Sequence, residues 1–233
     1  MRYYPVNLDI KNRACLVIGG GGVGTRKVKT LVECGAVVTV VSPEVSGPLE
    51  KMADAGLIAL EKRAYRASDL TGKFLVIGAT DDEALNRRIH ADAEDLNTLC
   101  NIADRPEICN FILPAIVNRG DLVLAVSTSG KSPAYAKKMR KDLEKQFGEE
   151  YEPFLCLMGA IRERLLKEEH APEAHKPLFE KLINAGLLDL IKTDRIEQIN
   201  ALLKEVLGKG YRYHELLKKP GPKGPAFRPK TEG

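Results

Sequence analysis

Residues 15–27 read Cys-Leu-Val-Ile-Gly-Gly-Gly-Gly-Val-Gly-Thr-Arg-Lys, a short apolar run followed by a glycine-rich turn and the start of a helical pattern. Gly19, Gly21 and Gly24 have the spacing of the G-x-G-x-x-G motif of dinucleotide-binding proteins. In that motif the first glycine permits a tight turn, the second lets the backbone approach a pyrophosphate, and the third packs the helix on the strand. A plain strand-to-helix turn can carry the same glycines, so the context of the motif decides between the two interpretations.

The residues after the motif complete a strand-helix-strand unit. A helix is predicted to begin near Gly22, to bury an apolar face over residues 28–32 and to end at Gly35, and residues 37–41 form a continuous apolar strand. Further strands are predicted over residues 58–60, 74–78 and 99–102. We therefore expect an α/β fold with a Rossmann-like doubly wound parallel sheet over residues 1–110, and phosphate binding at the positive end of the first helix.

The ends of the second and fourth strands supply further candidates for the cofactor site. An acidic residue usually binds the ribose after the second strand, and here Ser42 stands at that position with Glu44 two residues later. No arginine lies next to them to receive a ribose phosphate, so NAD is favoured over NADP. Asp82 is either part of this site or only the N-cap of the next helix. The predicted cofactor-binding residues are Gly19, Gly21, Gly22, Val23, Gly24, Ser42, Pro43, Glu44 and Thr80.

Asn101 and Asp104 follow the fifth strand, across the expected crevice from the glycine turn. Asp104 is a candidate proton acceptor there, although a carboxylate at this position can also simply begin a turn before Pro106. The helix between the fourth and fifth strands is predicted to bury residues 85, 89, 93 and 96 and to expose Asn86. The four histidines lie outside every ligand-facing motif, and His170 and His175 are expected at the surface.

From Phe111 the pattern changes to a hairpin, with strands over residues 111–117 and 122–127 and a turn over residues 118–121. A hairpin this apolar needs a partner surface, either the first domain or another subunit. A hydroxyl-rich loop then opens a basic helix, with Ser132 as N-cap and Pro133 in its first turn. This region forms either an anion site or a solvated helix face. The predicted substrate-binding residues are Asn101, Ser127, Thr128, Lys131, Lys137, Lys138 and Arg140.

The remaining chain and the composition complete the domain prediction. Helices near residues 152–168, 177–189 and 194–207 are expected in a C-terminal domain over residues 148–217, after a small α+β segment over residues 111–147, and residues 218–233 are expected to be disordered. The net charge of +4 does not suggest nucleic-acid binding, and the five scattered cysteines indicate neither disulfides nor a metal site. Without an apolar run long enough for a membrane span or a signal peptide, a cytoplasmic location is expected.

Six motifs in one order resemble the precorrin-2 dehydrogenase family, which includes the N-terminal module of bacterial siroheme synthases. They are Val-Ile-Gly-Gly-Gly at 17–21, Gly-Ala-Val-Val-Thr-Val-Val-Ser-Pro-Glu at 35–44, Ile-Gly-Ala-Thr-Asp-Asp at 77–82, Cys-Asn-Ile-Ala-Asp at 100–104, Phe-Ile-Leu-Pro-Ala-Ile-Val at 111–117 and Ser-Thr-Ser-Gly-Lys-Ser-Pro at 127–133. The resemblance implies NAD-dependent oxidation of precorrin-2 to sirohydrochlorin. It also implies Asp104 as the catalytic residue, a homodimer built through the segment after Phe111 and a helical C-terminal domain.

Two other functions remain open at the level of the sequence. The first is a chelatase that inserts ferrous iron or cobalt into sirohydrochlorin, alone or in addition to the oxidation. The second is an NAD-sensing regulatory protein, which would leave Asp104 and the basic helix without a task. Formation of NADH from precorrin-2 separates the dehydrogenase from both alternatives.

Overall fold

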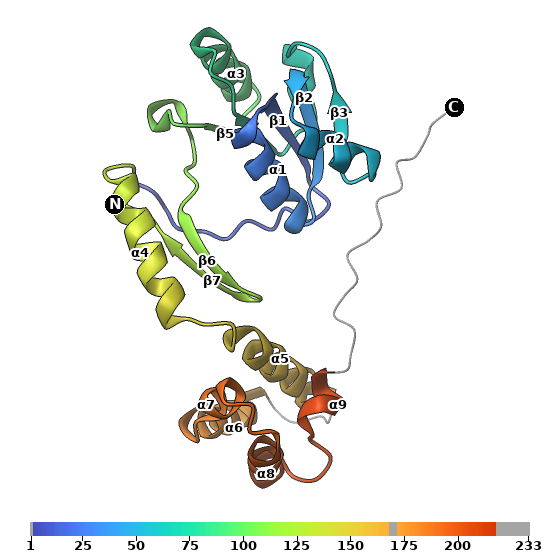
Figure 1. The fold of residues 1–233 in the computed structure, drawn as a ribbon, viewed down its shortest axis with the longest axis vertical. Coiled ribbons are helices and arrows are strands. Elements are labelled where there is room, and N and C mark those ends of the chain that lie inside the picture. Colours follow the sequence, from blue (N-terminus) through green and yellow to red (C-terminus); the bar gives the residue numbers. More distant parts are fainter. Residues whose placement is uncertain (1, 168–171, 218–233) are drawn as a thin grey trace. The chain divides into compact units, whose positions relative to one another are not determined.

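The computed structural model describes residues 2–167 and 172–217, with side chains described from His175 onward in the helix that begins at Pro172. The chain forms two compact units that divide between Leu113 and Pro114 (Figure 1). In the described residues, no helix combines the length and the apolar character that a membrane crossing needs.

The first unit is a doubly wound α/β domain, as predicted. Its five strands are all parallel and lie in the order β3-β2-β1-β4-β5. They are β1 (Ala14–Gly20), β2 (Val37–Val45), β3 (Ala59–Glu61), β4 (Leu75–Gly78) and β5 (Leu99–Ile102). The helices are α1 (Gly22–Glu33), α2 (Gly47–Asp54) and α3 (Glu83–Asp95), with short 3₁₀ turns η1 (Ala67–Leu70) and η2 (Pro106–Ile108). The predicted fold class is therefore confirmed.

Alternation along the strands explains why both faces of this sheet are covered. In β1, Cys15 and Val17 pack in the cluster formed with α1 and α2, whereas Leu16 and Ile18 pack in the cluster formed with α3 and η1. All four residues are almost completely buried, which is why the strand reads as a continuous apolar run instead of alternating with polar residues. The sheet thus presents only its ends to a ligand.

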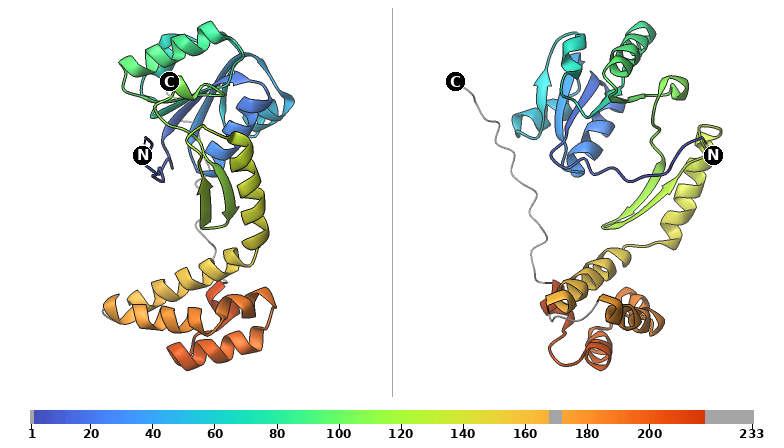
Figure 2. Two further views of the ribbon diagram at one scale, coloured as in Figure 1. Left: turned by 90° about the vertical axis from the view of Figure 1, so that its left-hand side faces the viewer. Right: turned by 180° about the vertical axis from the view of Figure 1, so that it is seen from behind.

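The second unit begins with a two-stranded antiparallel sheet, β6 (Ala115–Arg119) and β7 (Leu122–Val126), beside which α4 (Pro133–Gln146) packs (Figure 2). The first hairpin strand begins at Ala115 and not at Phe111 as predicted. Five further helices follow: α5 (Tyr151–Lys167), α6 (Pro172–Asn184), α7 (Leu187–Lys192), α8 (Ile196–Leu207) and α9 (Tyr213–Leu217). They bury a core of their own, which includes Leu157, Ile161, Leu182 and Leu203.

Several predictions for the helical region were wrong in detail. The helix predicted over residues 177–189 is interrupted, because Gly186 has φ of 77° and separates α6 from α7. The sequence pattern also missed α9. His175 is 5% exposed and therefore not a surface residue. His170 and the predicted disordered tail, residues 218–233, lie outside the described residues.

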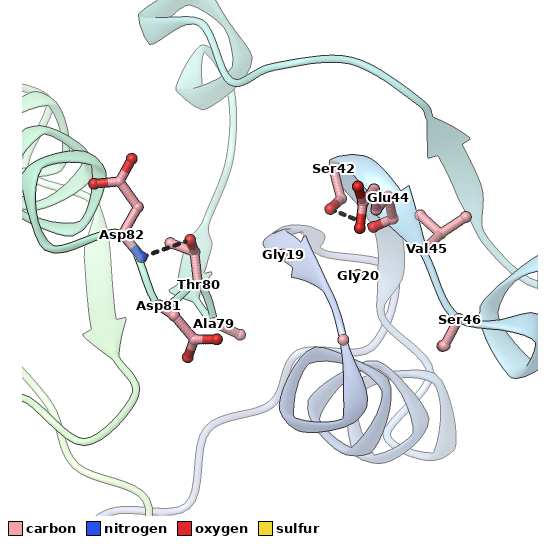
Figure 3. A pocket seen from close by; sticks show the side chains of 11 residues that line it. Gly19, Gly20, Ser42, Glu44, Val45, Ser46, Ala79, Thr80, Asp81 and Asp82 are labelled. Carbon is pink, nitrogen blue, oxygen red and sulfur yellow. Dashed lines mark hydrogen bonds between the residues drawn. The ribbon is translucent and has the colours of Figure 1, made fainter.

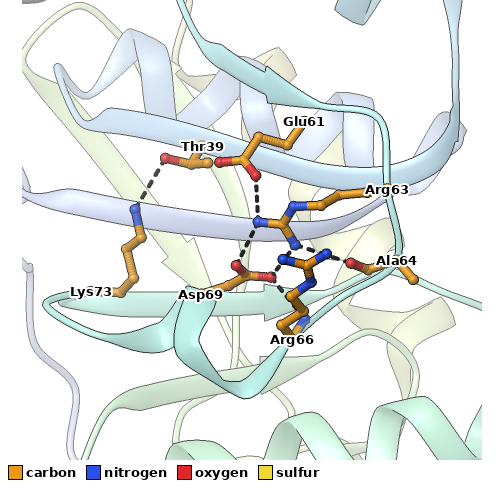
Figure 4. A network of polar contacts seen from close by, with 7 residues as sticks. All are labelled: Thr39, Glu61, Arg63, Ala64, Arg66, Asp69 and Lys73. Carbon is orange, nitrogen blue, oxygen red and sulfur yellow. Dashed lines mark hydrogen bonds and ion pairs between the residues drawn. The ribbon is translucent and has the colours of Figure 1, made fainter.

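A polar network holds the segment between β3 and β4 (Figure 4). The guanidinium of Arg63 donates to both carboxylate oxygens of Asp69, at 2.8 and 2.6 Å, and also pairs with Glu61. The backbone N–H of Arg66 donates to Asp69 at 2.9 Å. The hydrogen bonds from Arg63 lower the pKa of the Asp69 carboxyl, and the backbone bond from Arg66 acts in the same direction against burial.

We expect Asp69→Asn to destabilise the protein, most strongly near neutral pH. A carboxyl whose pKa is lowered in the folded state stabilises that state above its ordinary pKa of 3.8, and this contribution is lost as the pH falls through the folded-state value. The loss of unfolding free energy in Asp69→Asn should therefore shrink on acidification below about pH 4. Urea titrations across this pH range measure it, with exposed Asp95→Asn as the control. A pH-independent difference contradicts the prediction.

Candidate active site

The glycine turn is shaped by two backbone contacts that exclude any larger residue. Gly19 has φ of 112°, and a Cβ on it would stand 2.2 Å from the carbonyl oxygen of Ala79. A Cβ on Gly24 would stand 2.1 Å from the carbonyl oxygen of Gly19. These glycines therefore bring β1, α1 and the end of β4 together, in the structural roles that the motif assigns to its first and third glycine.

The middle of the turn is different, because it faces open space. A Cβ on Gly21 or Gly22 would meet no atom within 4 Å. No side chain caps the N-terminus of α1, so the backbone N–H groups of its first turn remain available for an anion. Side-chain hydrogen bonds also hold the turn. The Thr25 hydroxyl donates to the carbonyl oxygen of Gly21 at 2.9 Å and lies 2.7 Å from the Ser46 hydroxyl.

A cleft of about 450 Å³ lies at this turn (Figure 3), and we call it the glycine cleft. Its walls come from the ends of three neighbouring strands: the turn after β1, the end of β2 and the segment after β4. The lining residues are Gly19, Gly20, Gly21, Ser42, Glu44, Val45, Ser46, Ala79, Thr80, Asp81 and Asp82. The cleft therefore lies where a doubly wound sheet binds its nucleotide.

The β2 wall fits an unphosphorylated ribose. The Ser42 hydroxyl donates to the backbone carbonyl of Glu44 at 2.6 Å, so its proton is already used. The Glu44 carboxylate is exposed and makes no hydrogen bond or ion pair with any residue that the structure describes. It is thus free to accept hydrogen bonds from ribose hydroxyls and would repel a phosphate on them.

A second cleft of about 190 Å³, the aspartate cleft, lies on the other side of the segment after β4. It is lined by Val23, Ala79, Thr80, Asp81, Glu83, Asn86, Ala103, Asp104 and Arg105. Asp104 has φ of 61°, a left-handed conformation that non-glycine residues adopt rarely, and its side chain is exposed. Arg105 forms ion pairs with Glu83 at 3.4 Å and with Glu107 at 3.8 Å.

The segment that carries Asp104 is held against the outer edge of β5. The Cys109 thiol lies 3.1 Å from the backbone nitrogen of Ile102 and 3.1 Å from the carbonyl oxygen of Arg105. Burial raises the pKa of this thiol, which keeps it protonated and able to donate. The Asn110 side chain accepts from Cys100 N and donates to the carbonyl oxygen of Thr98, at 2.8 and 3.0 Å. These contacts replace a missing neighbouring strand and fix the loop around Asp104.

Most predicted cofactor residues line one of the two clefts, and three do not. Val23 lines the aspartate cleft, Thr80 lines both, and Gly22, Gly24 and Pro43 line neither. The interpretation of Asp82 as an N-cap is confirmed, because its carboxylate accepts from the backbone N–H of Leu85 at 3.0 Å. Asp82 also lines the glycine cleft, and its role in binding the cofactor stays a prediction.

The predicted substrate-binding residues are divided between the two units. Asn101 is buried and donates to the carbonyl oxygen of Phe111 at 3.0 Å, so its amide is engaged within the protein. The hydroxyls of Ser127 and Thr128 accept from backbone N–H groups of their own loop, and Arg140 pairs with Glu144. Lys131, Lys137 and Lys138 are exposed and form no ion pair with another residue of the described part of the chain. Binding of substrate by these residues stays a prediction.

Sequence reasoning missed two polar residues near Asp104. Asn86, predicted to face solvent, is 5% exposed, and its amide donates to the carbonyl oxygen of Thr80 at 2.9 Å. Lys27, on α1, is half-buried and interacts electrostatically with Asp104. Its place in the Arg-Lys pair after the glycine motif was visible in the sequence, but nothing there indicated that it faces the aspartate.

The fold and the glycine cleft together define an NAD(P)-binding Rossmann domain. The comparisons with known proteins agree: residues 6–115 match the family model described as "Putative NAD(P)-binding", and residues 119–146 match "Sirohaem biosynthesis protein central". These matches support the resemblance to the precorrin-2 dehydrogenase family that the motifs suggested, and they support the expected NAD cofactor.

The relatives include proteins that are longer than this chain and one of similar length. The siroheme synthase of Nitrosococcus oceani is 33% identical over 211 residues, which are 91% of this chain and 45% of that protein. The siroheme synthase of Pseudoalteromonas atlantica is 42% identical over 144 residues, 62% of this chain and 31% of that protein. The chain thus spans less than half the length of these two relatives. The solved structure of "SirC, precorrin-2 dehydrogenase" is 29% identical, with a TM-score of 0.73 over 88% of this chain and 98% of that one.

We expect Gly21→Val to abolish NAD binding without unfolding the protein. The new side chain meets no protein atom at its Cβ, but it occupies the space through which a pyrophosphate would approach the backbone. Calorimetric titration with NAD measures the effect. Gly24→Val is the matched comparison, because its Cβ collides with the Gly19 carbonyl and should lower the unfolding midpoint as well. Unchanged NAD affinity in Gly21→Val contradicts the placement.

Proposed function

We propose that this protein oxidises precorrin-2 to sirohydrochlorin with NAD. The observation that carries the proposal is the pair of clefts on either side of residues 79–82, one built for a dinucleotide and the other holding Asp104. The end-to-end structural similarity to a precorrin-2 dehydrogenase supports the substrate, and the free Glu44 carboxylate supports NAD over NADP.

The oxidation removes two hydrogens from the substrate, one as a hydride and one as a proton. NAD, when bound, accepts the hydride. The proton needs a separate acceptor. Asp81 and Asp104 are the carboxylates of the aspartate cleft that carry no ion pair among the described residues, and of these two Asp104 stands on a left-handed backbone. The residues of the glycine cleft that would hold the cofactor are Gly19, Gly21 and Thr80, and Glu44 would bind the ribose.

We expect Asp104→Ala to fold and to bind NAD but to lose at least about 100-fold in the rate of NADH formation from precorrin-2, the usual cost of removing a general base. Absorbance of NADH and of sirohydrochlorin follows the reaction, and Asp54→Ala, an exposed change on α2, is the control. Near-normal turnover by Asp104→Ala rules out the mechanism. Wild-type protein that forms no NADH from precorrin-2 rules out the function itself, and ferrous or cobalt ion added to sirohydrochlorin then tests the chelatase alternative.

The proposal includes carboxylate binding by the second unit. The substrate carries eight carboxylates, so its binding needs a local supply of cations on a protein with a net charge of only +4. Lys131, Lys137 and Lys138 are exposed cations without an ion-pair partner in the described residues, near the N-terminus of α4. These three lysines, with Ser127 and Thr128 of the same unit, are proposed to bind carboxylates of the substrate.

We also propose a homodimer through the hairpin. Ile116 and Val123 are 41% and 49% exposed on the same face of the hairpin, where Ile116 pairs with Ala125 and Val123 with Asn118. Both are large apolar residues on a two-stranded sheet that is too small to be stable alone. Ile116→Asp should shift the protein from dimer to monomer or prevent folding, and light scattering at micromolar concentration measures this. Leu57→Asp, which adds the same charge at an exposed apolar residue outside the hairpin, should remain dimeric. A monomeric wild-type protein overturns the proposal.

A further inference from the structure

Lys27 places a cation beside the aspartate cleft. It lies in α1, four residues after Val23, so the two side chains share one face of the helix. Val23 and Asp104 both line the aspartate cleft, and the charges of Lys27 and Asp104 interact. Lys27 therefore lies on the face of α1 that borders the aspartate cleft, although neither fold class nor cofactor binding requires a cation at this position.

Among the described residues, this cation has no hydrogen-bond or ion-pair partner that would explain it as part of the fold. The Lys27 side chain makes no hydrogen bond and no ion pair with another residue of ranges 2–167 and 172–217, and its interaction with Asp104 acts beyond ion-pair distance. The neighbouring cations differ, because Arg105 is paired with Glu83 and Glu107, and Arg87 donates to Glu83 at 2.8 Å. Lys27 is thus the half-buried cation of this region that remains available.

The surroundings of Lys27 disfavour its charge. Burial lowers the pKa of the ammonium, and the positive charge of Arg26 lowers it further, whereas Asp104 raises it. A partly desolvated charge without a close partner destabilises the folded protein and is typical of sites that receive a ligand of opposite sign. An anion bound there would remove the penalty.

We propose that Lys27 binds a carboxylate of the tetrapyrrole substrate next to Asp104. The inference rests on the proposed function, which brings eight carboxylates to this cleft. The phosphates of NAD are the other possible source of an anion, but they already have the backbone N–H groups at the start of α1. Lys27 shares the helix face of Val23, which lines the aspartate cleft and not the glycine cleft. The ammonium also offsets the repulsion between the bound carboxylate and Asp104.

The test is direct binding of sirohydrochlorin, the stable product with the same carboxylates, to full-length protein without NAD, followed by fluorescence quenching. Lys27→Met should weaken this binding about 10- to 100-fold, the usual effect of losing a hydrogen bond to a charged group. Lys27→Arg should recover most of the affinity, and Lys29→Met, an exposed lysine of the same helix, should bind like wild type. The unfolding midpoint of Lys27→Met should equal or exceed that of wild type, because the disfavoured charge is gone.

Other results of these measurements distinguish an error in the role of Lys27 from an error in the proposed function. Unchanged sirohydrochlorin binding by Lys27→Met overturns the inference, and so does weaker NAD binding with unchanged tetrapyrrole binding, which would assign Lys27 to the cofactor phosphates. A lower kcat with unchanged KM and unchanged binding also overturns it, because Lys27 would then act only through Asp104. Wild-type protein that binds sirohydrochlorin but forms no NADH from precorrin-2 contradicts the proposed function alone. Failure of wild type to bind sirohydrochlorin contradicts both.

Discussion

The contact between the glycine turn and the end of β4 is the constraint on which the rest of the first unit depends. Gly19 lies so close to Ala79 that no side chain fits between them, and Gly24 closes on Gly19 in the same way. This packing sets the direction in which α1 leaves the sheet and brings residues 79–82 beside the turn. Both clefts share Ala79, Thr80 and Asp81, so one close backbone approach positions the cofactor site and the site around Asp104 together.

The side of the aspartate cleft that carries Asp104 is positioned by side-chain hydrogen bonds to β5. β5 is the edge of the sheet, and the chain leaves it through a loop with no regular partner. Cys109 and Asn110 return along the strand and satisfy its backbone groups with side-chain atoms, at Ile102 and at Cys100 and Thr98. Because Asp104 lies between the strand and these anchors, the contacts that protect the sheet edge also limit the movement of its carboxylate.

The sequence predicted those features that follow from periodicity and from glycine spacing. The continuous apolar runs gave the parallel strands, and helix start signals placed α1 at Gly22 and α4 at Pro133, where Ser132 accepts from the N–H of Tyr135 as expected. Features that depend on distant neighbours could not be read in the same way. Asn86 was assigned to solvent by its position on the helix, but its amide reaches the Thr80 carbonyl, which only the folded chain brings near. The roles of Cys109 and Lys27 likewise need three-dimensional neighbours.

Three energetic costs of the first unit lie at or next to the aspartate cleft. Asp104 holds a left-handed backbone, Lys27 keeps a half-buried charge without a close partner, and the side-chain oxygen of Asn86 is buried without a hydrogen bond among the described residues. Elsewhere in this unit buried polar groups are satisfied, as the amide of Asn101 and the hydroxyl of Ser42 show. A fold optimised for stability alone would remove all three costs with ordinary substitutions. Their coincidence around the aspartate cleft is the pattern expected of the proposed site for binding and proton transfer.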